Sequence, residues 1–230
     1  MGKRGRMRLE REKLAILRFL RLTGCKEACE PPCLSHVSLR EQSALLLWLD
    51  QSGLALYLLD RLKQANAAHC LPEGILRRLE SKLEANRKRT RLLVAQLAEA
   101  VLLLEARGIP YAVLKGFSLS PEFCPDPVLR HQTDIDLLLA REDVAAASAA
   151  LASCGYSRMP SLHKEEFVFS TPLGKTPSRR DNIYAPREKK IEIHLSFWDP
   201  IHGIVIESPA LDLRNVCARE VMGVKFSGLP

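Results

Sequence analysis

Two aspartates separated by one residue are the clearest chemical signal in the chain. Asp134 and Asp136 open an apolar run that predicts a buried β-strand over residues 134–139. Side chains alternate across a strand, so both carboxylates project from the same face. Mg²⁺ often binds through one or two carboxylates together with substrate phosphates. The pair therefore predicts a magnesium site, with a strand cap or a turn as the alternative.

A third carboxylate occurs in a later apolar strand. Glu192 lies between Ile191 and Ile193 in a segment of strict alternation, so it projects from the face opposite to both. If this strand lies beside Asp134 and Asp136, the three acids converge. Two Mg²⁺ ions held in this way can clamp the attacking and leaving oxygens of a phosphoryl or nucleotidyl transfer. All three acids are thus predicted to be metal-binding and catalytic residues.

A lysine and a glycine follow the first predicted strand, residues 111–114. Gly116 would let the backbone approach a phosphate closely, and amides at a helix start would then hold the anion. Lys115 would add a positive charge next to a triphosphate. We therefore expect Lys115 and Gly116 to bind the substrate.

Two more residues are candidates for substrate binding because of their positions. Arg130 lies shortly before the aspartates, where it either stabilises a transferring phosphate or pairs with Asp126. His194 shares a strand face with Glu192. It either orients that carboxylate through a hydrogen bond or is a histidine satisfied within the sheet.

The periodicity of apolar residues changes near Pro110, from helical to extended. Helices are expected at residues 7–22, 39–66 with a break at Gly53, 72–106 and 141–154. Strands are expected at residues 111–114, 134–139, 164–170, 182–186 and 191–195. We therefore predict a helical region of residues 1–108 with a basic N-terminal segment, followed by an α/β domain of residues 109–230.

Composition and charge narrow the class of protein. Of the 230 residues, 47% are hydrophobic and 27% charged, which excludes a wholly disordered chain. No apolar run reaches the ~20 residues needed to cross a bilayer, so no membrane partner is expected. The net charge of +7 is concentrated in residues 1–110, with 20 Lys and Arg against 12 Asp and Glu. This basic half either binds nucleic acid or acidic lipid, or is a well-solvated helical surface.

The cysteines predict a reducing compartment. Their number is seven, which is odd, and no secretory signal precedes them, so we expect a cytoplasmic protein with free thiols. Three residues lie between Cys25 and Cys29 and three between Cys29 and Cys33, a spacing unlike that of zinc knuckles. Ordinary loop cysteines are the expected interpretation, with a metal site as the alternative.

Several motifs, taken together and in order, resemble a known family. They are Val113-Leu114-Lys115-Gly116, Arg130, Thr133-Asp134-Ile135-Asp136-Leu137-Leu138, Gly155-Tyr156, His163 and Ile191-Glu192-Ile193-His194. This set, over residues 40–225, resembles an uncharacterised bacterial nucleotidyltransferase family of the DNA polymerase β-like superfamily. The resemblance implies an α+β fold, in which an N-terminal helical region is followed by a small mixed sheet flanked by helices.

The resemblance also implies functional roles. Asp134 and Asp136 match the superfamily's metal-binding pair, and Glu192 matches its third carboxylate. Lys115-Gly116 stands where many members carry Gly-Ser, the turn that holds the triphosphate. The family usually continues into a further helical segment, so a chain stopping at Pro230 is expected to be a truncated or incomplete member.

These observations lead to one main expectation and two alternatives. The main one is a Mg²⁺-dependent nucleotidyltransferase, with two ions, that moves a nucleoside monophosphate from a nucleoside triphosphate to an acceptor hydroxyl and releases pyrophosphate. The acceptor is a protein, a nucleic acid or a small molecule. The second is a non-catalytic nucleotide- or nucleic-acid-binding module, for example of a toxin–antitoxin or defence system. The third, a helical interaction protein, predicts that the three acids are scattered over the surface.

Overall fold

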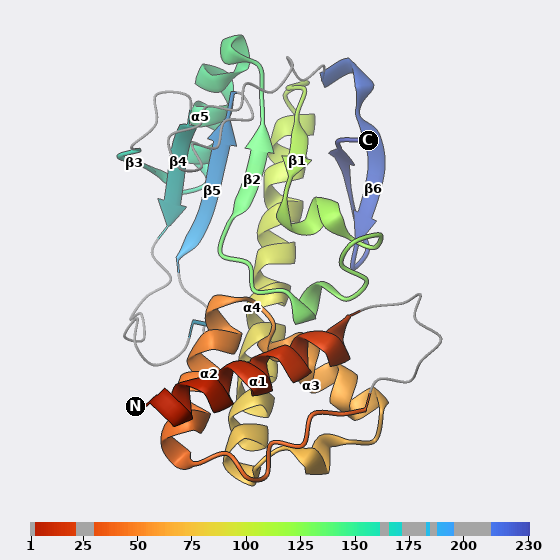
Figure 1. Ribbon diagram of the computed structural model, residues 1–230. Coiled ribbons are helices and arrows are strands. Elements are labelled where there is room, and N and C mark those ends of the chain that lie inside the picture. Colours follow the sequence, from red (N-terminus) through yellow and green to blue (C-terminus); the bar gives the residue numbers. More distant parts are fainter. Residues whose placement is uncertain (1–2, 22–29, 162–165, 172–182, 185–187, 196–212) are drawn as a thin grey trace. The chain divides into compact units, whose positions relative to one another are not determined.

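The chain forms a mixed α/β structure in two compact units (Figure 1). The computed structural model describes residues 3–21, 30–161, 166–171, 183–184, 188–195 and 213–230. These contain five α-helices and a seven-stranded mixed sheet. The first unit comprises Met1–Arg87, Val128–His131 and Arg179–Ala185, and the second comprises Lys88–Pro127, Gln132–Ser178 and Pro186–Pro230.

Helices α1 to α3 and the start of α4 form the first unit. Their bounds are Lys3–Leu20 for α1, Leu39–Gln51 for α2, Ala55–Gln64 for α3 and Glu73–Glu105 for α4. Ser38 starts α2 with a capping box, because its side chain and that of Glu41 each satisfy the other's backbone amide. Gly53, at φ +70°, lies between α2 and α3, which confirms the predicted break. Leucines of these helices supply most of the first unit's core.

Buried polar side chains fasten two short segments into the first unit. Asn86 of α4 donates through Nδ2 to the carbonyls of Val128 and Arg130, at 2.6 and 3.1 Å. The Tyr184 hydroxyl lies 3.3 Å from Asp50 Oδ1, and Lys82 Nζ lies 2.6 Å from Asp50 Oδ2. Residues 128–131 and 183–184 therefore pack with helices that lie far away in the sequence.

The second unit is built on a sheet with the strand order β3-β4-β5-β2-β1-β7-β6. The strands are β1 Ala112–Leu114, β2 Ile135–Leu138, β3 Ser157–Met159, β4 Glu166–Thr171, β5 Lys189–His194, β6 Cys217–Val221 and β7 Val224–Gly228. At its centre, β1 and β2 are antiparallel, whereas β2 and β5 are parallel. Helix α5, Val144–Ser153, follows β2.

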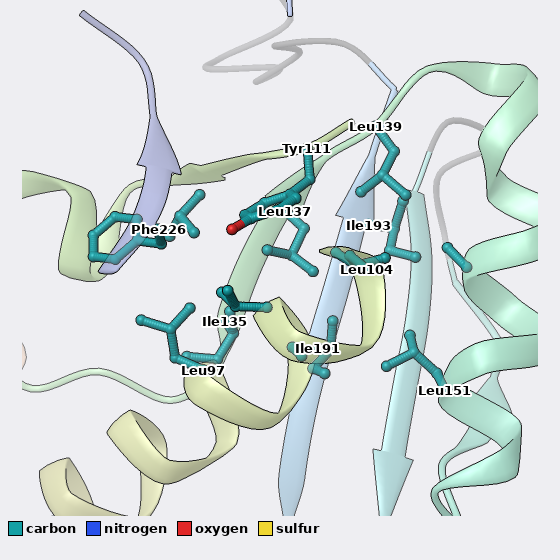
Figure 2. Close-up of a cluster of buried hydrophobic side chains, with 14 of the residues drawn as sticks. Leu97, Leu104, Tyr111, Ile135, Leu137, Leu139, Leu151, Ile191, Ile193 and Phe226 are labelled. Carbon is teal, nitrogen blue, oxygen red and sulfur yellow. The ribbon is translucent and has the colours of Figure 1, made fainter. Parts of the chain in front are cut away.

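One face of this sheet is covered by apolar side chains of α4 and α5 (Figure 2). Ile135 and Leu137 of β2 and Ile191 and Ile193 of β5 are each at most 1% exposed. They pack in one cluster with residues of α4 that include Leu97 and Leu104, and with Leu151 of α5. Alternation along β2 and β5 therefore directs Asp136 and Glu192 to the other face.

The sheet is larger than the small one expected. The strands β3, β6 and β7 were not predicted, because they are only three to five residues long and carry polar or exposed positions. Residues 183 and 184 form a turn, so the strand expected at 182–186 is wrong there, and the rest of that segment lies outside the described residues. The other predicted strands are confirmed to within a few residues.

Buried tyrosines make the stability of the fold sensitive to alkali. Burial raises the pKa of Tyr111 to about 12, helped by the neighbouring carboxylate of Glu105. Burial also raises the pKa values of Tyr156 and Tyr184. In the unfolded chain a tyrosine loses its proton near pH 10. Folding therefore keeps these protons bound while unfolding releases them, and stability falls as the pH rises above about 10.

We expect the free energy of unfolding to be insensitive to these tyrosines below pH ~10 and to fall by up to about 1.4 kcal/mol per pH unit per tyrosine above it. Urea denaturation at half-unit steps from pH 8.5 to 11.5 measures this slope. The Tyr111→Phe variant should lose stability less steeply than the wild type between pH 10 and 11.5. An equal slope in the two proteins would contradict the assignment of a raised pKa to Tyr111.

Candidate active site

Strand register brings two of the predicted acids together in the second unit. Asp136 of β2 is paired with Glu192 of β5 across the parallel ladder, and with Leu114 of β1 on its other side. The side chains of Asp136 and Glu192 are 6% and 14% exposed. Two carboxylates therefore lie next to each other on the central strands, largely withdrawn from water.

His194 lies two residues beyond Glu192 on the same face of β5. Its Nε2 is 2.9 Å from Oδ1 of Asp136 and 3.7 Å from Oε2 of Glu192. The histidine is thus placed against both acids rather than against Glu192 alone. Asp136, Glu192 and His194 each offer a ligand atom, and these atoms lie within 4.8 Å of one another.

Asp134 approaches this group through a lysine. Lys190, which precedes Glu192 by two residues on β5, forms an ion pair with Glu192, and its Nζ lies 3.7 Å from Oδ2 of Asp134. The same Oδ2 accepts a hydrogen bond of 2.9 Å from the hydroxyl of Thr133. The ammonium group of Lys190 therefore lies within contact distance of both Asp134 and Glu192.

Lys115 leaves β1 and turns back towards the acids. Its Nζ lies 3.3 Å from Oδ1 of Asp136, and its side chain is 52% exposed. Lys115 and Gly116 have positive φ values of +47° and +32° and form the predicted turn. Gly116 then begins a 3₁₀-helix of only four residues, Gly116–Leu119, so this turn is followed by no long helix.

Gly116 is in close contact with a side chain of the chain itself. A Cβ atom at this position would lie 2.6 Å from Cδ and 2.7 Å from Oε1 of Gln132. Gln132 is held there because its Nε2 donates a hydrogen bond of 2.8 Å to the carbonyl of Asp134. The glycine therefore lets the turn after β1 approach the loop that carries Asp134, a role additional to the predicted phosphate contact.

We expect Gly116→Ala to destabilise the protein by about 2–3 kcal/mol, from backbone strain at positive φ and from displacement of the Gln132 amide. The double variant Gly116→Ala/Gln132→Ala should regain about half of that loss, because the second substitution removes the atoms that the new methyl group meets. Thermal and urea denaturation of the two single variants and the double variant give the coupling free energy. Strictly additive effects would show that Gln132 is not what the methyl group meets.

The surroundings of Asp136 favour its charged form. Burial by itself would raise the pKa of this carboxyl group, but the hydrogen bond from His194 and the positive charge of Lys115 outweigh burial and hold the pKa below its usual value. Asp136 is therefore an ionised oxygen donor at neutral pH.

The surroundings of Glu192 have the opposite effect. Burial raises the pKa of Glu192, the hydrogen bond from Lys190 opposes this, and the nearby charge of Asp134 raises it further. For Lys190, burial lowers the pKa, but the hydrogen bond with Glu192 and the surrounding acids outweigh burial and raise it. Both carboxylates can offer an oxygen to a metal ion, and Glu192, whose pKa is raised, is the better suited of the two to accept a proton as well.

The donor set fits a divalent cation. An octahedral ion with bonds of ~2.1 Å has neighbouring ligands about 3.0 Å apart and opposite ligands about 4.2 Å apart. The separations of 2.9 and 3.7 Å from Nε2 of His194 to the two carboxylates lie at or between these values. Asp136, Glu192 and His194 would therefore hold one ion after displacements of about 1 Å or less.

Arg130 belongs to the first unit. Its carbonyl accepts from Asn86, and its Nη1 is buried without a hydrogen-bond partner among the described residues. Its role at a phosphate stays a prediction. His163, Cys25 and Cys29 lie outside the described residues, and Cys33 is an exposed free cysteine.

Three residues that contribute to the site were missed from the sequence. Lys190 shares the strand face of Glu192 and His194, so the spacing of two residues along β5 was an available signal. Glu166 is paired with His194 across β4 and β5, and Gln132 lies over Gly116. These two contacts depend on strand pairing and loop conformation, for which the sequence holds no local signal.

Comparison with known proteins supports the family resemblance of the motifs around Asp134, Asp136 and Glu192. A family model described as "Uncharacterised nucleotidyltransferase" matches residues 38–228, which include every described residue of the site. A search of curated proteins found no significant match. Among the described residues, no helix is long and apolar enough to span a membrane. The chain belongs to this uncharacterised nucleotidyltransferase family.

Proposed function

We propose that the protein is a Mg²⁺-dependent nucleotidyltransferase that transfers a nucleoside monophosphate from a nucleoside triphosphate to an acceptor hydroxyl. The proposal rests mainly on the pairing of Asp136 with Glu192 on adjacent parallel strands, in a chain of a nucleotidyltransferase family. The antiparallel β1–β2 pair, with Asp136 on its second strand and Asp134 directly before that strand, supports a polymerase β-like type of fold.

The acids would hold the metal ions. Asp136, Glu192 and His194 form the group that fits one ion, and Asp134 is the remaining oxygen donor for a second. Divalent ions bound here would neutralise charge on the triphosphate and lower the pKa of the acceptor hydroxyl. The ammonium group of Lys190 contacts both Asp134 and Glu192, so a second ion would have to displace it.

The residues around the acids would bind the substrate and accept the proton. Lys115 is half exposed and can move its ammonium group from Asp136 to the β- and γ-phosphates. The backbone at Gly116 is the other proposed phosphate contact in this unit. The acceptor oxygen bonds to the α-phosphorus, the bond to the β-phosphate oxygen breaks, and pyrophosphate leaves. Glu192, whose pKa is raised, takes the acceptor proton.

Transfer of label from two positions of the triphosphate tests this proposal. Each of ATP, CTP, GTP and UTP, labelled at the α- or the γ-phosphate, is incubated with Mg²⁺ and with three acceptor pools: the protein itself, total RNA and a small-molecule extract. We expect the α-label in one acceptor pool and an equal amount of γ-label in pyrophosphate, both abolished by EDTA. Transfer of the γ-label to an acceptor would instead indicate a phosphotransferase.

A non-catalytic nucleotide-binding module is the second candidate. It is favoured by the lysines that already neutralise the acids and by the contact of Gln132 with Gly116. Thermal stabilisation of the protein by a triphosphate, without turnover in any pool, would support this candidate over the enzyme. Salt-sensitive RNA binding would support the nucleic-acid version.

A further inference from the structure

His194 is held on the sheet so that its two ring nitrogens face different acids. Nε2 faces Asp136 and Glu192, at 2.9 and 3.7 Å. Nδ1 faces Oε1 of Glu166, at 4.0 Å. The His194 side chain is 15% exposed. The ring therefore lies between two carboxylates on one side and a third on the other.

Glu166 is itself fixed by its neighbours. It lies opposite His194 in the antiparallel β4–β5 ladder, and its Oε2 accepts a hydrogen bond of 2.7 Å from the hydroxyl of Ser161. A histidine that binds a metal through one nitrogen commonly directs the N–H of the other at a carboxylate, which sets its tautomer and ring orientation. Without an ion, Nε2 donates its hydrogen bond to Asp136; with an ion bound and the proton on Nδ1, towards Glu166, Nε2 would present its lone pair to that ion.

We propose that Nε2 of His194 is a direct ligand of the divalent ion held by Asp136 and Glu192, and that this nitrogen makes the ion site prefer Mn²⁺ to Mg²⁺. The inference rests on the proposed function, since it concerns an ion of the same site. Mg²⁺ is a hard cation that favours oxygen ligands, whereas imidazole nitrogen suits transition metals. A second ion, held by Asp134 and the triphosphate, would have oxygen donors only and would be expected to be Mg²⁺.

The other interpretation of the same contacts is that His194 only orients Asp136 through a hydrogen bond. Both interpretations explain the distance of 2.9 Å. The electron paramagnetic resonance spectrum of a bound paramagnetic ion distinguishes them, because only a directly bound imidazole nitrogen gives a strong ¹⁴N hyperfine coupling. They also differ in metal selectivity, which a hydrogen bond to Asp136 would leave unchanged.

Pulsed electron paramagnetic resonance of the full chain with Mn²⁺ tests the proposal. We expect coupling to one directly bound ¹⁴N in the wild type and its loss in His194→Gln, whose amide oxygen keeps an ion bound. His69→Gln, at an exposed histidine of the first unit, is the matched control and should keep the coupling. Mn²⁺ bound to the wild type without ¹⁴N coupling, or with coupling that survives in His194→Gln, would overturn the proposal.

Competition between the two ions gives a second measurement. The measured quantity is the ratio of Mg²⁺ to Mn²⁺ concentration at which half of the bound Mn²⁺ is displaced. This ratio should be at least about tenfold lower in His194→Gln than in the wild type. Glu166→Gln should weaken Mn²⁺ binding by about 10- to 100-fold but keep the ¹⁴N coupling, because Glu166 acts through His194. An unchanged preference in His194→Gln would contradict the role of the nitrogen.

These outcomes separate the inference from the proposed function. Bound Mn²⁺ without nitrogen coupling, together with transfer of the α-label, would overturn the role of His194 and leave the nucleotidyltransferase standing. Nitrogen coupling without label transfer to any acceptor pool would support the role of His194 and overturn the nucleotidyltransferase activity. A wild-type protein that binds no Mn²⁺ would contradict both.

Discussion

Asp136→Asn should reduce nucleotidyl transfer by more than about 100-fold. Loss of a residue that only supports a metal ligand already costs about 10- to 100-fold, and Asp136 is proposed to bind the metal directly. It is also the most buried acid of the site, in contact with His194 and Lys115 at 2.9 and 3.3 Å. The change in label transfer per unit of folded protein measures this effect.

The same substitution should also change how stability depends on pH. The pKa of Asp136 is lowered in the folded protein, so its charged form adds stability that is present above about pH 3.9, the ordinary value, and is lost as the pH falls through the lowered value. Asp136→Asn removes that contribution. Its free energy of unfolding should therefore be below that of the wild type at pH 7, and the difference should shrink towards low pH.

Glu142→Gln is the matched control for Asp136→Asn. Glu142 is an exposed acid of the same unit, in the 3₁₀-helix that precedes α5, and its loss removes the same charge. Glu142→Gln should leave unchanged both the label transfer and the way in which the free energy of unfolding falls at low pH. Wild-type transfer by Asp136→Asn would refute the proposed metal site outright.

Lys190→Met is expected to have opposite effects on folding and on metal binding. Lys190 pairs with Glu192 and lies 3.7 Å from Asp134, so its loss leaves the neighbouring carboxylates to repel one another. We expect the metal-free protein to unfold more easily. The loss of the ammonium charge should also raise the affinity for divalent ions, because such a group and a divalent ion about 5 Å apart repel by about 1.7 kcal/mol even in water.

Isothermal titration with Mn²⁺, and melting curves with and without it, measure both effects. We expect an affinity at least about tenfold higher in Lys190→Met, and a melting temperature that is below the wild type's without Mn²⁺ but approaches it when Mn²⁺ is added. Lys189→Met is the control: Lys189 is on the opposite face of β5, where its Nζ pairs with Glu99 at 2.9 Å. If both variants bound Mn²⁺ as the wild type does, Lys190 would not compete with the ion.

The elements that carry the site could be predicted because their apolar patterns are strong and local. The alternation Ile191-Glu192-Ile193-His194 identifies both a strand and its polar face. The long helix α4, with its helical spacing of apolar residues, and the glycine break between α2 and α3 were predictable for the same reason. The hairpin of β6 and β7 was missed, since its strands are five residues long and hold few buried apolar positions among Arg219, Glu220 and Lys225.

The contacts within the site were less predictable than its strands. That Asp136 lies opposite Glu192, rather than one residue further along, follows from the register of β2 and β5, which depends on packing across the whole sheet. The ammonium groups of Lys115 and Lys190, which lie against Asp136 and Glu192, were not predicted to pair with these acids. Ion pairs between residues on different strands cannot be predicted from the sequence of either strand alone.

The alternation along β5 has a consequence for how the protein can change over time. Lys190, Glu192 and His194 face the site, whereas Ile191 and Ile193 are buried in the core. Inserting or deleting one amino acid in this segment would send the charged groups inward and the isoleucines outward together. Such an insertion or deletion would abolish both folding and the proposed activity. We therefore expect descendants of this gene to tolerate length changes in the loops but none within β5.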